Sequence, residues 1–327
     1  MTSNAPSLLC PIDFSEFSRQ ALAHAAAIAS HFGARLIALS VDDPLLTEAA
    51  AAAGFVPSPA EETRRELKRF CGDTLASFAG PGTIEYHVTV GKPATEILRT
   101  ARDQHVDLIV MSSHGRSGMR KLFFGSTTER VLRETSVPVL VTRDWRRPFT
   151  SLSELARHIT RVIVPVDLTQ ESAHQLVVAH GIAEAVSARL IAVHVLEPLF
   201  VPQRVRLALP GAEHMRRSQA EEKLASVVAA IDGPQRTESM VVLGEPSEEI
   251  VKLAEARNAG LIVMGLHSSG PLGPRMGSVT YRVLCQTDAL VLALPPHAVK
   301  VGPAVALSQS FRQRADTQSQ SHPVVLR

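Results

Sequence analysis

The chain has 327 residues, of which 45% are hydrophobic and 4% aromatic, and its formal net charge is +2. Basic and acidic side chains are interspersed and aromatic rings are few, so neither a basic stripe nor a stacking surface predicts a nucleic-acid partner. The three cysteines, Cys10, Cys71 and Cys285, have neither zinc nor disulfide spacing. The N-terminus lacks a signal-peptide pattern and no stretch is apolar enough to span a membrane, so we expect a cytoplasmic protein.

One long segment of the chain is present twice. Residues 8–44 and 162–198 align without a gap and are identical at 14 of 37 positions. Three further pairs of segments match downstream: Gly91-Lys92-Pro93 with Gly244-Glu245-Pro246, residues 107–111 with 260–264, and Gly125-Ser126 with Gly277-Ser278. One domain is therefore duplicated, and any site in one half has a counterpart in the other.

The first half alternates short β-branched runs with longer helical patterns, which predicts βαβ units and a parallel sheet. The predicted strands are 8–12, 35–41, 83–90, 107–112 and 137–142, and the predicted helices lie near 15–31, 60–79, 93–105 and 125–135. Ser15 is expected to cap the first helix, Gly33 to end it in a left-handed conformation, and Pro93 to occupy the first turn of the third. Residues 42–59 are expected to form a surface connection, and Cys10 to lie in the core.

The second half repeats this pattern. Its predicted strands lie near 161–166, 189–195, 237–242, 260–265 and 289–294, and its predicted helices near 169–185, 212–230, 246–258 and 277–286. Thr169 takes the capping position of Ser15, and residues 197–211 are expected to form a second surface connection. The predicted organisation is a first domain over 1–143, a linker over 144–160 with one short helix, a second domain over 161–296 and a disordered tail over 297–327.

The loop after the fourth predicted strand is the first place to look for a site, because open parallel sheets bind ligands beyond the carboxyl ends of their strands. In the first half, Gly115 would let the backbone approach an anion, and Gly125 and Ser126 would place N–H groups at a helix N-terminus, which favours phosphate. Positive charge nearby comes from Arg116, Arg120 and Lys121. The pattern is neither a P-loop nor a dinucleotide fingerprint. A tight turn with Ser126 as an N-cap is the alternative.

These features together resemble the universal stress protein family: an Asp after the first strand, a Met-x-Ser-His-Gly segment, nine residues, and Gly-Ser opening a helix. The resemblance covers roughly residues 6–143 and 160–295. It implies two tandem Rossmann-like α/β domains, each a five-stranded parallel sheet of order 3-2-1-4-5 flanked by helices. In members of the family that bind ATP, a G-x2-G-x9-G-[ST] loop cradles the phosphates, and the first-strand Asp and a second-strand Val border the adenosine.

In the first half, the resemblance implies a site for ATP, with or without Mg²⁺. The corresponding residues are Asp13, Val41, Ser112, Gly115, Gly125, Ser126 and Thr127. Ser112 stands where the family has its first Gly, and Asp13 could equally cap the first helix or bond the loop backbone. We expect the nucleotide in the first domain only.

In the second half, the corresponding residues form a weaker site: Asp167, Val195, Gly265, Gly277 and Ser278. The loop is one residue shorter, has Ser268 at the second Gly position and gains Pro271 and Pro274, each of which removes an N–H donor. We therefore expect a structural remnant there.

Other kinds of site are less well supported by the sequence. Four histidines, His24, His31, His174 and His180, fall on surface-type helical positions without carboxylate clusters, so no metal site is expected. His114 and His267 share one loop position, as hydrogen-bonded loop residues or as a catalytic base. No G-x-S-x-G elbow is present. We expect a stress-response regulatory protein that binds adenine nucleotide and is not an enzyme; a nucleotide-hydrolysing or adenylating enzyme and a nucleotide-free scaffold are the alternatives.

The fifth strands, 137–142 and 289–294, would be exposed sheet edges, which soluble proteins usually cover. We expect them to pair antiparallel with each other and form a pseudo-dimer within one chain. Because Leu290 stands at the position of Pro138, this pairing need not be symmetric. A homodimer of whole chains is left open, and protein partners are not identified by the sequence.

Overall fold

The computed structural model describes most of both halves of the chain. The described residues are 6–54, 58–76, 78, 83–113, 125–143, 151–199, 211–231, 237–266 and 276–295. Several sequence-based predictions fall outside these ranges: those on Gly115 and the rest of its loop, on residues 144–150, on most of 197–211, and on the C-terminal residues from 297.

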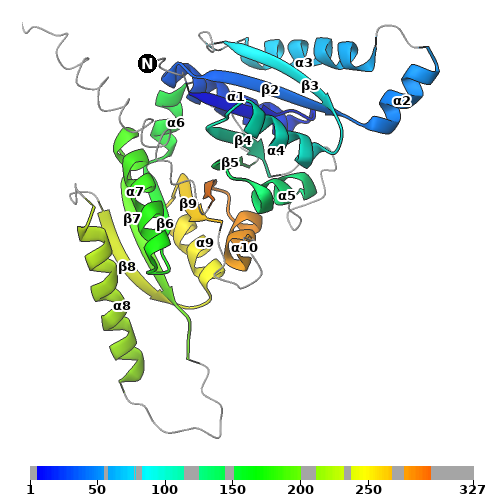
Figure 1. The fold of residues 1–327 in the computed structure, drawn as a ribbon. Coiled ribbons are helices and arrows are strands. Elements are labelled where there is room, and N and C mark those ends of the chain that lie inside the picture. Colours follow the sequence, from blue (N-terminus) through cyan, green and yellow to red (C-terminus); the bar gives the residue numbers. More distant parts are fainter. Residues whose placement is uncertain are drawn as a thin grey trace, which may run out of the picture.

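The elements of the two halves follow one another in the predicted alternation (Figure 1). The first half contains β1 (Ser7–Pro11), α1 (Glu16–Phe32), β2 (Arg35–Asp42), α2 (Pro44–Ala52), α3 (Pro59–Leu75), β3 (Ile84–Val90), α4 (Pro93–Asp103), β4 (Leu108–Ser112), α5 (Ser126–Glu134) and β5 (Val139–Thr142). After the linker helix α6 (Leu152–His158), the second half contains β6 (Arg161–Pro165), α7 (Gln170–Ala185), β7 (Arg189–Leu196), α8 (Ala212–Ala229), β8 (Thr237–Leu243), α9 (Pro246–Ala256), β9 (Leu261–Gly265), α10 (Ser278–Gln286) and β10 (Leu290–Leu294).

All ten strands form one sheet, in the order β3-β2-β1-β4-β5-β10-β9-β6-β7-β8. Within each half the order is 3-2-1-4-5 and the neighbouring strands are parallel, as the resemblance implied. The fifth strands β5 and β10 pair antiparallel, so the two expected sheets are joined into a continuous one. Figure 1 shows this junction between the two halves, with the linker helix α6 nearby.

The junction of the two halves is symmetric. Leu140 pairs with Leu292, Val139 with Ala293, and Val141 with Val291. Because Leu140 and Leu292 are counterparts in the repeat, a pseudo-twofold axis passes between them. Pro138 lies just before β5, outside the paired residues. Its missing N–H therefore leaves the register undisturbed, and the asymmetry that we considered does not arise.

Each face of the sheet carries one apolar core that runs through both halves. Residues of α1, α3, α6, α7 and α8 pack on one face, and residues of α4, α5, α9 and α10 pack on the other. Successive strand residues point to opposite faces, so a central strand such as β4 contributes Val110 to the first core and Ile109 to the second. This explains why the central strands read as continuous apolar runs.

Several local predictions are confirmed. The Ser15 hydroxyl accepts a hydrogen bond from the Ser18 N–H at 3.1 Å, so Ser15 caps α1. Gly33 ends this helix with a φ of 61°, and Pro93 is the first residue of α4. Cys10 is buried. The linker also contains the expected short helix, α6.

None of residues 42–54 is buried, as expected for a surface connection, but they contain a helix, α2, that was not predicted. It begins after Asp43, whose carboxylate accepts a hydrogen bond from the Leu45 N–H. Other predictions are wrong. Thr169 precedes α7, but its side chain makes no capping bond. Two of the histidines expected at the surface, His24 and His180, are buried. The Nδ1 atom of His24 lies 2.6 Å from the Gln20 carbonyl oxygen, which explains how α1 accommodates this side chain.

Membrane insertion was also considered from the sequence. Within the described ranges, none of the helices combines the length and the hydrophobicity that a bilayer crossing requires.

A candidate ligand cavity in the first domain

A cavity of about 610 Å³ lies at the carboxyl edge of the sheet in the first half. It is bordered by the ends of β1, β2 and β4 and by the start of α5, which is where the strand order reverses around β1. Six residues predicted from the sequence line it: Asp13, Val41, Ser112, Gly125, Ser126 and Thr127. The structure therefore brings together all the predicted first-domain site residues that it describes. Their role toward a ligand stays a prediction.

Two hydrogen bonds hold the start of α5 against the end of β4. The Gly125 N–H donates to the Ser113 carbonyl at 2.9 Å, and the Thr128 hydroxyl donates to the Ser112 carbonyl at 2.9 Å. The first N–H groups of an α-helix have no acceptor within the helix, and the N-cap Gly125 has no side chain to supply one. The N-terminus of α5 is thus available to an anion in the cavity.

Asp13 has a structural role besides its place in the cavity wall. Its Oδ1 atom accepts hydrogen bonds from the Ser15 N–H at 3.1 Å and from the Ser15 hydroxyl at 2.5 Å. These bonds shape the turn between β1 and α1, in which Phe14 adopts a φ of 62°. Asp13 therefore bonds the loop, which was one of the two roles considered for it, and its carboxylate still borders the cavity.

Sequence reasoning missed several polar residues of the cavity wall. Asp42 ends β2, and its Oδ1 atom accepts a hydrogen bond from the Thr63 hydroxyl at 2.9 Å. Its other oxygen, Oδ2, is buried without a hydrogen-bond partner among the described residues. Burial raises the pKa of Asp42, and the Thr63 hydrogen bond opposes that rise. The signal was available, because Asp42 and Asp43 directly follow the predicted second strand.

The described part of the cavity wall is acidic at one end. Four carboxylates, Asp13, Asp42, Asp43 and Glu66, line it, and this part contains no Lys, Arg or His. The N-terminus of α5 contributes positive dipole charge to the described wall. A ligand with an anionic end is therefore expected to place that end at α5 and its neutral end near β1 and β2.

The second half conserves the turn chemistry of this edge. Asp167 accepts hydrogen bonds from the Thr169 N–H at 3.0 Å and from the Thr169 hydroxyl at 2.6 Å, as Asp13 does from Ser15. Burial alone would raise the pKa of Asp167, but the hydrogen bonds from Thr169 and Ser172 outweigh burial and lower it. Gly277 precedes α10 as Gly125 precedes α5, and Ser278 is the first residue of α10.

The side chains at this edge differ between the halves. His194 stands where the first half has Ser40, and its Nδ1 atom lies 2.8 Å from the Val166 carbonyl oxygen at the end of β6. A Cβ atom on Gly265 would lie 2.0 Å from the Gln175 amide nitrogen, so a side chain here would have to displace the end of Gln175. Val195 follows His194 in β7. The predicted second-site residues thus lie at this edge, and His194 among them is larger than its counterpart Ser40.

Comparison with known proteins places the chain beside one family. The family model described as "Universal stress protein family" matches residues 6–143 and 158–295. Universal stress protein MJ0531 of Methanocaldococcus jannaschii is 32% identical over 145 residues, which cover 42% of this chain and 81% of that protein. YxiE of Bacillus subtilis is 32% identical over 145 residues, which cover 42% of this chain and 97% of that protein. Each relative therefore matches less than half of this chain.

Two solved structures share the fold over most of the chain. A universal stress protein from Archaeoglobus fulgidus has a TM-score of 0.61 at 20% identity, covering 90% of this chain and 100% of that chain. A structure described as a putative universal stress protein from Pseudomonas aeruginosa has a TM-score of 0.61 at 18% identity, covering 94% and 98%. At these identities the likeness concerns the fold.

Proposed function

The chain belongs to the universal stress protein family, and we propose that its first domain binds ATP in the cavity between β1, β2, β4 and α5. The observation that carries this proposal is the convergence of Asp13, Val41, Gly125 and Ser126 around one cavity. Its volume of about 610 Å³ falls in the range of small-molecule sites.

The charge distribution supports one orientation of the nucleotide. The phosphates would lie at the N-terminus of α5, where N–H groups and the helix dipole favour negative charge. The adenosine would lie near Asp13 and Val41, because the carboxylates at that end would repel phosphates. In the described ranges, no three His, Cys, Asp or Glu side chains gather in a metal-binding group. An accompanying Mg²⁺ would therefore take most of its oxygen ligands from the phosphates and water.

We propose a regulatory binding function in the cytoplasm, in which the second domain serves as a scaffold. The conserved turn bonds of Asp13 and Asp167 favour the rival view that these carboxylates are purely structural. A hydrolysing or adenylating enzyme is the other rival. If the carboxylates are purely structural and the chain is a nucleotide-free scaffold, the purified chain will not bind ATP. If the chain is an enzyme, it will convert ATP to product.

The decisive experiment is calorimetric titration of the whole chain with Mg-ATP, comparing Ser126→Asp with its counterpart Ser278→Asp. An aspartate in the first turn of a helix is compatible with folding, because the helix dipole favours it. It would also repel phosphates bound there. We expect Ser126→Asp to weaken ATP binding about tenfold or more, about 1.4 kcal/mol, and Ser278→Asp to leave the affinity within about twofold, an effect of a few tenths of a kcal/mol.

Each outcome of this titration separates the proposals. Absence of saturable binding by the wild type supports the nucleotide-free scaffold. Weakening by Ser278→Asp alone, or by both variants, contradicts binding in the first domain only. Incubation with labelled ATP then distinguishes a binder from an enzyme: we expect bound ATP to be recovered intact, and sustained release of ADP or AMP would show catalysis.

A further inference from the structure

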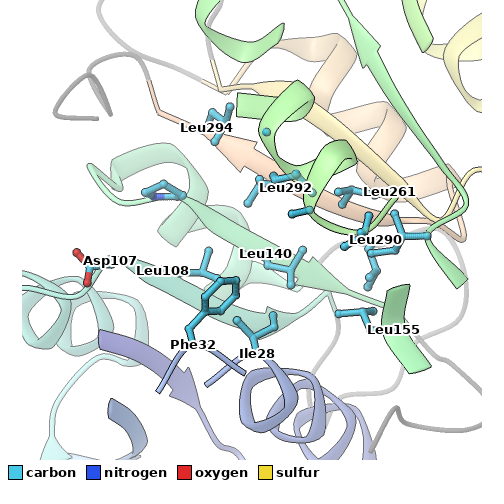
Figure 2. Close-up of a pocket in the computed structure, with 16 residues that line it drawn as sticks. Ile28, Phe32, Asp107, Leu108, Leu140, Leu155, Leu261, Leu290, Leu292 and Leu294 are labelled. Carbon is cyan, nitrogen blue, oxygen red and sulfur yellow. The ribbon is translucent and has the colours of Figure 1, made fainter. Parts of the chain in front are cut away.

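A second cavity lies between the two domains, on the face of the sheet covered by α1, α6 and α7. Its volume is about 120 Å³. Figure 2 shows leucines of both halves around it, including Leu140 of β5 and Leu292 of β10, the pair on the pseudo-twofold axis. The described lining is apolar except for Asp107, which lies at one end in Figure 2. This cavity is distinct from the candidate nucleotide site.

The cavity is lined on one side by residues of the second domain that are smaller than their counterparts in the first. Three lining positions carry such residues: Gly181 and Ala185 near the end of α7, and Val186 directly after it. Their first-domain counterparts are Ala27, His31 and Phe32. Interiors of proteins are close-packed and contain few voids larger than a water molecule. Smaller side chains at three neighbouring positions therefore leave space at the end of α7.

The linker helix α6 covers this space. Leu155 and Ile159 contribute to the lining, and both are buried. The end of α6 approaches the start of β9 so closely that a Cβ atom on Gly260 would lie 2.5 Å from the His158 carbonyl oxygen. The cavity is thus bounded by both domains and by the segment that joins them.

We propose that this interdomain cavity binds one uncharged apolar molecule about the size of a single six-membered ring. An apolar cavity of about 150 Å³ lined by Leu, Ile and Phe stays dry and binds benzene, because water finds no hydrogen-bond partners there. The cavity described here has a similar volume and lining, and it is partly open at the surface. A charged ligand would lose its hydration without gaining partners along the leucines and isoleucines.

The test uses fluorobenzene as the probe and the whole chain, followed by ¹⁹F NMR titration. Val186→Phe introduces the residue that the first domain has at this position and fills the cavity. Val177→Phe is the matched control, since Val177 lies on α7, the helix that ends just before Val186, is exposed and is not part of the lining. We expect saturable binding to the wild type and to Val177→Phe, and at least tenfold weaker binding to Val186→Phe.

Circular dichroism establishes that each variant is folded. If Val186→Phe does not fold, Gly181→Ala takes its place; it restores the first-domain residue, occupies part of the volume, and is expected to weaken binding severalfold. The proposal is overturned if the wild type shows no saturable binding. It is also overturned if the folded cavity-filling variant binds fluorobenzene as the wild type does.

Discussion

The carboxyl edges of the two domains share the hydrogen bonds of their turns and differ in the side chains around them. In both, an aspartate after the first strand accepts two hydrogen bonds from the residue two positions later. In both, a threonine of the following helix donates to the end of the fourth strand: Thr128 to Ser112, and Thr280 to Gly265. The side chains around these shared bonds have diverged, most clearly where Ser40 of the first domain is replaced by His194.

Comparison of the two halves distinguishes residues that the fold requires from residues whose side chains have diverged. A position that repeats in both halves with the same hydrogen bond is explained by the fold alone. A position that lines the cavity in one half and carries a larger side chain in the other is not explained that way. Duplication of Asp13 as Asp167 is therefore weak support for ligand binding, and Ser40 is more informative although no motif includes it.

The largest loss of stability is expected from substitutions at a turn that the two halves share. Gly91 and Gly244 have φ values of 154° and 156°. Cβ atoms there would lie 2.9 Å from Glu96 Cγ and 2.5 Å from Glu249 Cγ. We expect Gly91→Ala and Gly244→Ala each to lower the free energy of unfolding by about 2–4 kcal/mol, from backbone strain and side-chain overlap. Urea unfolding followed by circular dichroism measures the loss.

Gly72 supplies the control for this pair. It lies within α3, and a Cβ atom there would meet nothing within 4 Å. Gly72→Ala is expected to raise stability by about 0.5–1 kcal/mol, because alanine favours helix. Clearly different losses for the two other glycines would show that the domains do not depend on this turn to the same degree.

An intermediate effect, on ATP affinity, is expected from exchanging Ser40 and His194, which differ between the halves. Ser40→His would place a large side chain in the wall of the first-domain cavity, in the position that His194 takes in the second. If ATP binds there, we expect about tenfold weaker binding, about 1.4 kcal/mol, measured by calorimetry. His194→Ser is the reciprocal control and should leave ATP affinity unchanged. Unchanged binding by Ser40→His would mean that the nucleotide lies elsewhere.

The sequence predicted the sheet well because buried parallel strands leave a strong pattern. Apolar runs such as 108–111 and the internal repeat were sufficient to define ten strands, and the exposed edges of β5 and β10 predicted their pairing. The helix α2 was missed for the opposite reason. None of its residues is buried, and Leu45 and Leu46 are 75% and 72% exposed. Its sequence, PLLTEAAAA, is apolar nearly all round, so no pattern of apolar and polar faces marks it as a helix.

Side-chain environments were harder to predict than strands. Residues 20–29 of α1 are all buried, so the helix has no polar face from which the surroundings of His24 could be read. Burial lowers the pKa of His24, although the Gln20 carbonyl raises it in part. The interdomain cavity depends on how α1, α6 and α7 meet across the axis, which no local pattern encodes. Asp42 could have been noticed, but its buried oxygen could not.

The smallest effect is expected from two carboxylates whose pKa values shift in opposite directions. The pKa of Asp42 is raised above 3.8 and that of Asp167 is lowered below 3.8. Ionised Asp42 therefore lowers stability at neutral pH, and this penalty disappears as pH falls from its folded-state pKa to 3.8. Ionised Asp167 raises stability at neutral pH, and this contribution is lost only below 3.8, as pH falls through its folded-state pKa.

The matched variants Asp42→Asn and Asp167→Asn should show these signs in urea unfolding. At about pH 7, we expect the first to be slightly more stable and the second less stable than the wild type, each by less than about 1 kcal/mol because solvent screens both groups. The Asp42→Asn difference should vanish first as the solution is acidified, while the Asp167→Asn difference persists. A loss of stability in Asp42→Asn at neutral pH would contradict this expectation. It would show that the ionised carboxylate is stabilised by a partner of its buried oxygen, such as a cation or an N–H group.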